Sequence, residues 1–263
     1  MDRKYFFLSG LPRSGATLLS SILNQNPDIH SGPDSPVCGL INQTLQFLDN
    51  NEQHILYPKN NLDNQLIQSI LSCYYSDVKS NYIIDKCRIW NNLHNINIIK
   101  RYINPDVKII CCVRSILEIL ASYISLIKKS PHTSFVDHNL SHTNKKINDE
   151  NRCEWLMKKD GLIDISLSSL KESISLPYIH LIDYNMLVSH PHKVVSNLYE
   201  FLSLPEYQHD FSNIVNNFTT KDHLLGLPDL HKVKSTIQIT QRDISQILPE
   251  TIIKKYSSME FWS

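Results

Sequence analysis

A loop suited to binding an anion lies near the start of the chain. The apolar residues 5–9 predict a buried strand, the string GLPRSGAT follows at residues 10–17, and the apolar spacing of residues 17–26 predicts a helix. This order points backbone N–H groups and a helix N-terminus at an anion. Nucleoside-triphosphatase loops carry Lys before the final Ser or Thr, whereas this loop has Ala16 there and Arg13 as its cation. The loop is therefore poorly suited to β/γ-phosphate chemistry, but it can still bind another anionic group.

A second cation is expected at the same edge of the predicted sheet. Residues 107–113 form a continuous β-branched run typical of a central parallel strand, and Arg114 follows this run directly. Ser122 lies eight residues further on, in the next predicted helix. Open α/β sheets bind ligands at the C-terminal ends of their strands, and Arg offers a fork of donors to phosphate. Arg114 therefore predicts a second anion site.

The order of the predicted elements favours an α/β fold. Strands alternate with helices, which indicates a P-loop type three-layer fold, with about five mainly parallel strands flanked by helices. We expect a single domain over residues 1–263, with the polar segment 130–151 as a long loop or lid. The predicted strands after the first are residues 82–85, 107–113 and 178–182, and the later helices are residues 115–129 and 191–202.

The string GLPRSGATLLSSILNQNPDI, residues 10–29, resembles the 5′-phosphosulfate loop of the sulfotransferases that use 3′-phosphoadenosine 5′-phosphosulfate (PAPS). It is most similar to the protein-tyrosine and related bacterial branch, which reads PRSGTTL, so Ala16 departs from the usual Thr. The resemblance implies that Arg114 and Ser122 bind the nucleotide 3′-phosphate. It also implies that the 5′-phosphosulfate is held by Arg13, Ser14, Gly15, Ala16 and Thr17.

The same resemblance suggests the catalytic groups. Asp34 lies where the tyrosine-sulfating branch has a Glu general base, with Asp28 as the rival and a simple turn residue as the structural alternative. Lys86 corresponds to a Lys that neutralises charge at the bridging oxygen. Ser235, within HKVKST, corresponds to a Ser that contacts the cofactor, and Tyr184 corresponds to a residue that faces the nucleotide.

The predicted function is transfer of a sulfuryl group from PAPS to an acceptor hydroxyl, with 3′,5′-adenosine bisphosphate as product and no metal. The acceptor stays open between a protein tyrosine, a glycan and a small molecule. The alternatives are a small-molecule P-loop kinase, which would need a loop Lys and a magnesium carboxylate, and a non-catalytic nucleotide-binding protein.

Composition sets the remaining expectations. Lys plus Arg and Asp plus Glu each number 26, so no basic field suggests nucleic acid. Six cysteines without a C-x-x-C pair indicate reduced thiols, and no apolar run is long enough for a membrane span. We therefore expect a cytoplasmic protein, and its oligomeric state is left open.

Overall fold

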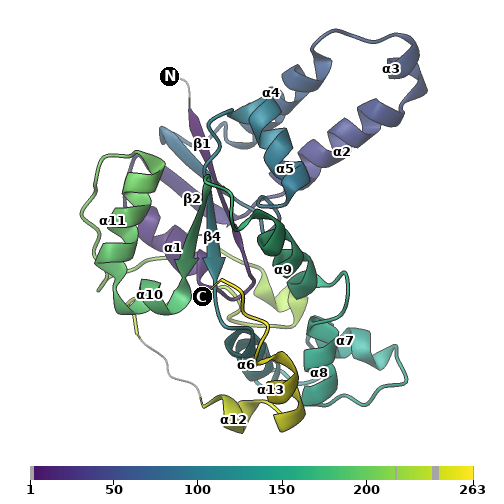
Figure 1. The fold of residues 1–263 in the computed structure, drawn as a ribbon, viewed down its shortest axis with the longest axis vertical. Coiled ribbons are helices and arrows are strands. Elements are labelled where there is room, and N and C mark those ends of the chain that lie inside the picture. The colour runs from purple at the N-terminus through teal and green to yellow at the C-terminus, as the bar shows by residue number, and fades with distance from the viewer. Residues whose placement is uncertain (1–2, 217, 239–242, 263) are drawn as a thin grey trace.

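A parallel sheet lies at the centre of the molecule (Figure 1). The computed structural model describes residues 3–216, 218–238 and 243–262, and within them five parallel strands pair in the order β2-β3-β1-β4-β5. Their bounds are β1 Lys4–Gly10, β2 Ile29–Asp34, β3 Tyr82–Lys86, β4 Ile109–Val113 and β5 Ile179–Asp183. The strand order puts the loop that follows β1 at the middle of the sheet's C-terminal edge.

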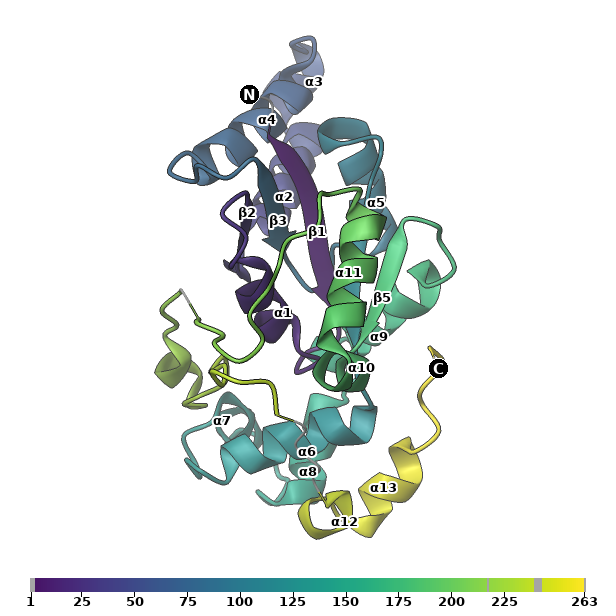
Figure 2. The same cartoon turned by 90° about the vertical axis from the view of Figure 1, so that its left-hand side faces the viewer.

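Helices cover both faces of this sheet and extend past its C-terminal edge. In Figures 1 and 2, α6, α8, α12 and α13 lie beyond the ends at which the strand arrows point. The first helices are α1 Ala16–Leu23, α2 Val37–Asn50, α3 Glu52–Leu56, α4 Leu62–Tyr74 and α5 Leu93–Ile98, which continues as a π-helical turn, Ile99–Ile103. The later ones are α6 Ile116–Ile127, α7 Phe135–Ser141, α8 Asp149–Leu156, α9 Leu162–Ser173, α10 Tyr184–Ser189, α11 Pro191–Leu202, α12 Ile244–Ile247 and α13 Glu250–Tyr256.

Alternation along β1 divides the core into two layers. Phe6 and Leu8 point to one face and pack with residues of α1, α10 and α11. Phe7 points to the other face, where its ring lies 4.8 Å from that of Trp90 and belongs to the cluster formed with α2, α4, α6 and α9. Cys111 and Cys112 of β4 likewise belong to opposite clusters, as their adjacency predicts. The three-layer α/β prediction is thus confirmed.

Two parts of the chain differ from the sequence expectations. Asp34 is the last residue of strand β2 and not a turn residue after the first helix. The segment 130–151 is not one long loop, since it contains α7 and the start of α8. Arg152 of α8 donates to both carboxylate oxygens of Asp137 in α7 at 2.7 and 2.8 Å, and this buried ion pair fixes the segment against α8. No helix within the described ranges has the length and apolar character needed to cross a membrane.

Candidate active site

The backbone of the loop between β1 and α1 is held close to β4. Gly10 has φ +121°, and a Cβ there would lie 2.2 Å from the carbonyl oxygen of Cys112, so only glycine fits this approach of two strands. The Leu11 N–H then donates to the same Cys112 carbonyl at 2.9 Å. Arg13 and Gly15 both adopt left-handed conformations, with φ values of 61° and 94°. The chain thereby curls into a tight loop that ends where α1 begins.

The start of α1 leaves backbone donors for an anion. Gly15 precedes the first helical residue and has no side chain with which to cap the first N–H groups. The Ser14 hydroxyl donates to the Leu11 carbonyl at 2.5 Å, so it closes the loop internally. Helix N-termini with free N–H groups attract anions through both hydrogen bonds and the helix dipole. The loop thus has the backbone geometry that an anion site needs, and Ser14 supports the loop through this internal hydrogen bond.

Side chains that end or follow neighbouring strands form a row along the sheet edge. Asp34 ends β2 and Lys86 ends β3, and these two residues are register partners with an Nζ–Oδ2 distance of 3.8 Å. Arg114 follows β4 and Tyr184 follows β5, on the other side of the loop. All four line one cavity of about 280 Å³ together with the loop residues Arg13, Gly15, Ala16 and Thr17. The sequence-predicted residues of five strands thus meet at one site.

Lys86 is a buried cation beside the loop. Its side chain is 6% exposed, and its ammonium donates to the Thr17 hydroxyl at 3.3 Å. Burial lowers the pKa of Lys86 from its ordinary value of 10.5, while the Asp34 carboxylate opposes this shift. The Asp34 side chain is 35% exposed and can therefore contact both Lys86 and a molecule entering from solvent.

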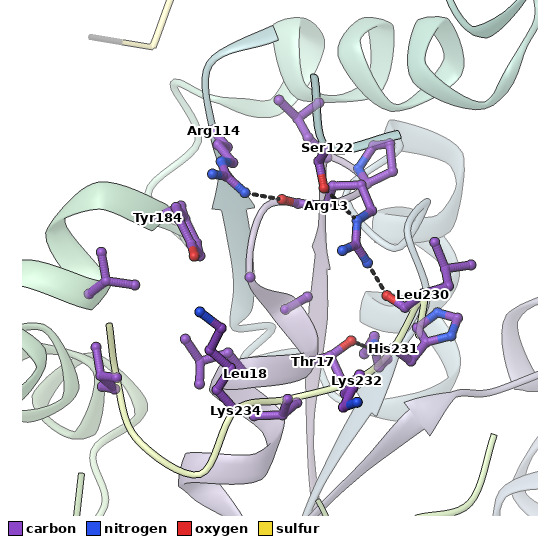
Figure 3. A pocket seen from close by; sticks show the side chains of 18 of the residues that line it. Arg13, Thr17, Leu18, Arg114, Ser122, Tyr184, Leu230, His231, Lys232 and Lys234 are labelled. Atoms are coloured by element: carbon purple, nitrogen blue, oxygen red, sulfur yellow. Dashed lines mark hydrogen bonds between the residues drawn. The ribbon is translucent and has the colours of Figure 1, made fainter. Parts of the chain in front are cut away.

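Arg114 is held by three groups on the opposite side of the loop (Figure 3). Its Nη1 donates to the Arg13 carbonyl at 3.2 Å, and its Nε donates to the Glu118 carboxylate at 3.2 Å. The guanidinium lies 3.9 Å from the ring centroid of Tyr184, a cation–π contact. These contacts orient a buried guanidinium at the cavity wall.

Ser122 contacts the loop Arg and not Arg114. The Arg13 Nε donates to the Ser122 hydroxyl at 3.2 Å, and Arg13 Nη1 donates to the Leu230 carbonyl. Figure 3 shows Ser122 next to Arg13, with Arg114 further along on the side of the Arg13 carbonyl. Both predicted members of the second anion site line the cavity, and Arg13 links them.

Comparison with known proteins assigns the family. A family model described as "Sulfotransferase family" matches residues 6–209, which include the loop, most of β1 and all of the other four strands. The chain belongs to the sulfotransferase family. Sulfuryl transfer, predicted from the loop string and its resemblance, is thereby confirmed at the level of the family.

Solved sulfotransferases share the fold of this sulfotransferase. A sulfotransferase domain from the curacin biosynthetic pathway is 19% identical, with a TM-score of 0.54 over 99% of this chain and 92% of that one. Mouse sulfotransferase SULT7A1, solved with PAP, is 13% identical, with a TM-score of 0.55 over 97% of this chain and 82% of that one. Sulfotransferase STF9 from Mycobacterium avium is 12% identical with a TM-score of 0.50, covering 100% of this chain and 78% of its own. A sequence search of curated proteins found no match.

Two candidate residues of the sulfotransferase lie away from the cavity. Ser235 is exposed and does not line it, although its neighbours Lys234 and Thr236 do. The Ser235 carbonyl instead accepts from the Ile214 N–H at 2.6 Å, so its cofactor contact stays a prediction. Asp28, the rival base, precedes β2 and therefore lies at the opposite end of that strand from Asp34.

Several cavity residues were missed from the sequence. Arg88, Tyr123, His231, Lys232 and Lys234 all line the site. His231 makes two contacts with the buried Asp222 carboxylate. Its Nδ1 lies 2.6 Å from Asp222 Oδ1, and its backbone N–H donates to Asp222 Oδ2 at 2.8 Å. Two sequence signals could have found these cavity residues, namely the basic string HKVK and the position of Arg88 two residues after Lys86. Nothing in the sequence pairs Asp222 with His231.

Proposed function

We propose that this sulfotransferase uses PAPS as its donor and transfers the sulfuryl group to an acceptor hydroxyl. The observation that carries this proposal is the pair of cationic sites on either side of the β1 loop. Arg13 and Lys86 are the cations next to the loop and the start of α1. Arg114 lies on the other side of the loop and packs against Tyr184. A donor with a 5′-phosphosulfate and a separate 3′-phosphate has one anionic group for each of these two cationic sites. The PAP complex of the mouse neighbour supports the same nucleotide class.

The residues present fit this donor. The N–H groups at the start of α1, with Arg13, would hold the 5′-phosphosulfate. Arg114 and Ser122 would hold the 3′-phosphate, because a guanidinium pairs well with phosphate oxygens. Tyr184, already packed under Arg114, would face the nucleotide. When bound, the donor supplies the activated sulfuryl group.

The proposed chemistry uses Asp34 and Lys86 as a pair. Asp34 accepts the proton of the acceptor hydroxyl as its oxygen bonds to sulfur. Lys86 neutralises the negative charge that develops on the departing 5′-phosphate oxygen as the old sulfur–oxygen bond breaks. The Thr17 hydroxyl holds the Lys86 ammonium towards the loop. Because Lys86 is buried, its charge acts in a low dielectric and is worth more than a surface charge would be.

The alternative of a P-loop kinase fits this site less well. Ala16, the first residue of α1, stands where a kinase loop requires Lys. The remaining alternative, nucleotide binding without turnover, depends on whether Asp34 acts as a base. The acceptor is a hydroxyl compound, with protein tyrosine, glycan and small molecule as the proposed classes.

Asp34 provides the test of function. Asp34→Asn keeps the side-chain size but removes the base, so kcat with PAPS should fall by about 100-fold or more. Binding of 3′,5′-adenosine bisphosphate, measured by calorimetry, should change little, and Asp34→Glu should retain measurable turnover. Asp28→Asn is a matched control at the far end of β2 and should leave both quantities unchanged.

Two outcomes would contradict the proposal. Wild-type turnover by Asp34→Asn would assign the proton transfer to another group. Equal affinity of the wild-type protein for AMP and for the 3′,5′-bisphosphate would remove the basis for PAPS.

A further inference from the structure

Arg88 is a cavity residue that the proposed reaction does not use. It lies two residues after Lys86, lines the cavity and is half-buried. Its carbonyl accepts from the buried Ser9 hydroxyl at 2.8 Å, which fixes the backbone at this point. The guanidinium makes no hydrogen bond or ion pair with any residue that the structure describes. A half-buried charge without a partner is costly, so a cavity that keeps one is suited to an anionic ligand.

The other cavity cations already have partners. Lys86 contacts Asp34 and Thr17, and Arg114 contacts Glu118. Lys232 and Lys234 also have polar partners, at 3.5 Å to the Asp229 carboxylate and 3.0 Å to the Gln238 side chain, respectively. Arg88 is therefore the cavity cation most in need of a ligand among the described residues.

The strand order puts Arg88 on the acceptor side of the cavity. It follows β3, which lies between β1 and β2, whereas Arg114 follows β4 on the opposite side of β1. Neighbouring strands are about 4.8 Å apart, so roughly 10 Å separates β3 from β4 along the sheet. Arg88 thus stands with Asp34 and Lys86 and away from the proposed 3′-phosphate site.

Electrostatics places the Arg88 charge near the reacting groups. Burial raises the pKa of the Tyr123 hydroxyl, the charges of Arg88 and Arg13 lower it, and the Asp34 charge raises it. The Arg88 charge also contributes to the lowered pKa of Lys86, after the larger effect of burial. Arg88, Arg13 and Asp34 therefore act on the same small volume.

We propose that Arg88 binds an anionic group of the acceptor, so that the preferred acceptors are hydroxyl compounds that also carry a carboxylate. This proposal rests on the proposed function, because it assigns Asp34 to that hydroxyl. Arg88 offers a fork of N–H donors that matches the two oxygens of a carboxylate. It sets specificity and orients the acceptor, while Asp34 receives the proton.

The test compares acceptors that differ only in charge. The pairs are 4-hydroxyphenylacetate with its methyl ester and 3-hydroxybutyrate with its methyl ester, each with PAPS as donor. Wild-type kcat/KM should favour the acid by about 10-fold or more. Arg88→Gln should abolish this preference mainly by raising KM for the acid, Arg88→Lys should keep part of it, and Arg88→Glu should shift preference to the cationic phenol tyramine. Arg101→Gln, at an exposed Arg outside the cavity, is the matched control and should keep the wild-type preference.

The results separate this proposal from the function on which it rests. An equal loss for acid and ester in Arg88→Gln would overturn it, since Arg88 would then act on the donor or the transferring group. Equal turnover of acid and ester by the wild-type protein would also overturn it, while leaving sulfuryl transfer intact. If no pair is turned over, calorimetry on the PAP-saturated protein decides: binding of acid no tighter than ester overturns the proposal. Failure to bind PAP would instead refute the proposed function.

Discussion

Replacing Arg114 should remove selectivity for the 3′-phosphate more than it weakens nucleotide binding in general. Arg114→Met keeps much of the apolar stem and deletes the charge of a residue that is 5% exposed. A charge-assisted hydrogen bond to phosphate is worth about 1.5–3 kcal/mol, and at about 1.4 kcal/mol per decade the upper value corresponds to about 100-fold in Kd. The variant also loses the 3.2 Å hydrogen bond to the Arg13 carbonyl, at about 1 kcal/mol or about 5-fold for any nucleotide.

The ratio of two affinities isolates the 3′-phosphate. From these values, the preference for 3′,5′-adenosine bisphosphate over AMP should fall by about 100-fold, because the 5-fold loop effect acts on both nucleotides and cancels in the ratio. Calorimetry of both nucleotides at one ionic strength measures it, because salt screens charge interactions. Glu118→Gln is the control, since it alters a contact of Arg114 but keeps the guanidinium charge. An equal loss for both nucleotides would show that Arg114 only supports the loop, and the two-site argument would fail.

The other perturbations act on the pKa of Lys86, the loop and the segment before α8. Because burial lowers the pKa of Lys86, its active protonated form is lost as pH rises, so kcat/KM for the donor should fall at a pH below 10.5. Lys86→Arg, if active, should move that decline to higher pH. Gly15→Ala should weaken nucleotide binding by about 10-fold or more, because φ is +94° and the new Cβ would lie 2.7 Å from the Tyr184 ring. Calorimetry measures this affinity, and an unchanged value would contradict the loop geometry. Asp137→Asn should lower the free energy of unfolding by about 1.5–3 kcal/mol, since Arg152 loses charge-assisted hydrogen bonds to Asp137 but keeps the Asp149 carboxylate. Urea denaturation measures this loss, and an unchanged free energy of unfolding would contradict the role given to the ion pair.

The sequence predicted the elements whose signals are local. Strand β4 is buried on both faces and reads as a continuous β-branched run, so its end at Val113 and the place of Arg114 followed from composition alone. The anion loop lies within one contiguous string, and its glycine at position 15 does adopt a positive φ. Helix α11 begins at Pro191 and ends at Leu202, the bounds expected from its apolar spacing and its first-turn proline.

Strand β2 was missed because its sequence, IHSGPD, lacks strand character. It lies at the edge of the sheet, where proline is tolerated, and its pairing with β3 is irregular between Ser31 and Asp34. Helix α7 was missed for a different reason, since much of its support comes from the Asp137–Arg152 ion pair, whose partners are 15 residues apart. Both elements depend on tertiary contacts, which local periodicity does not encode.

The loop joins the two halves of the site. The Arg13 carbonyl accepts from Arg114 on the side proposed for the 3′-phosphate, and the Thr17 hydroxyl accepts from Lys86 on the side proposed for the acceptor. A substitution of either cation therefore changes a loop contact as well as a ligand contact, and any single affinity or rate combines the two effects. Ratios between matched ligands cancel the shared loop effect. For this reason the 3′-phosphate preference reports on Arg114, the acid-to-ester preference reports on Arg88, and neither absolute affinity alone could assign these roles.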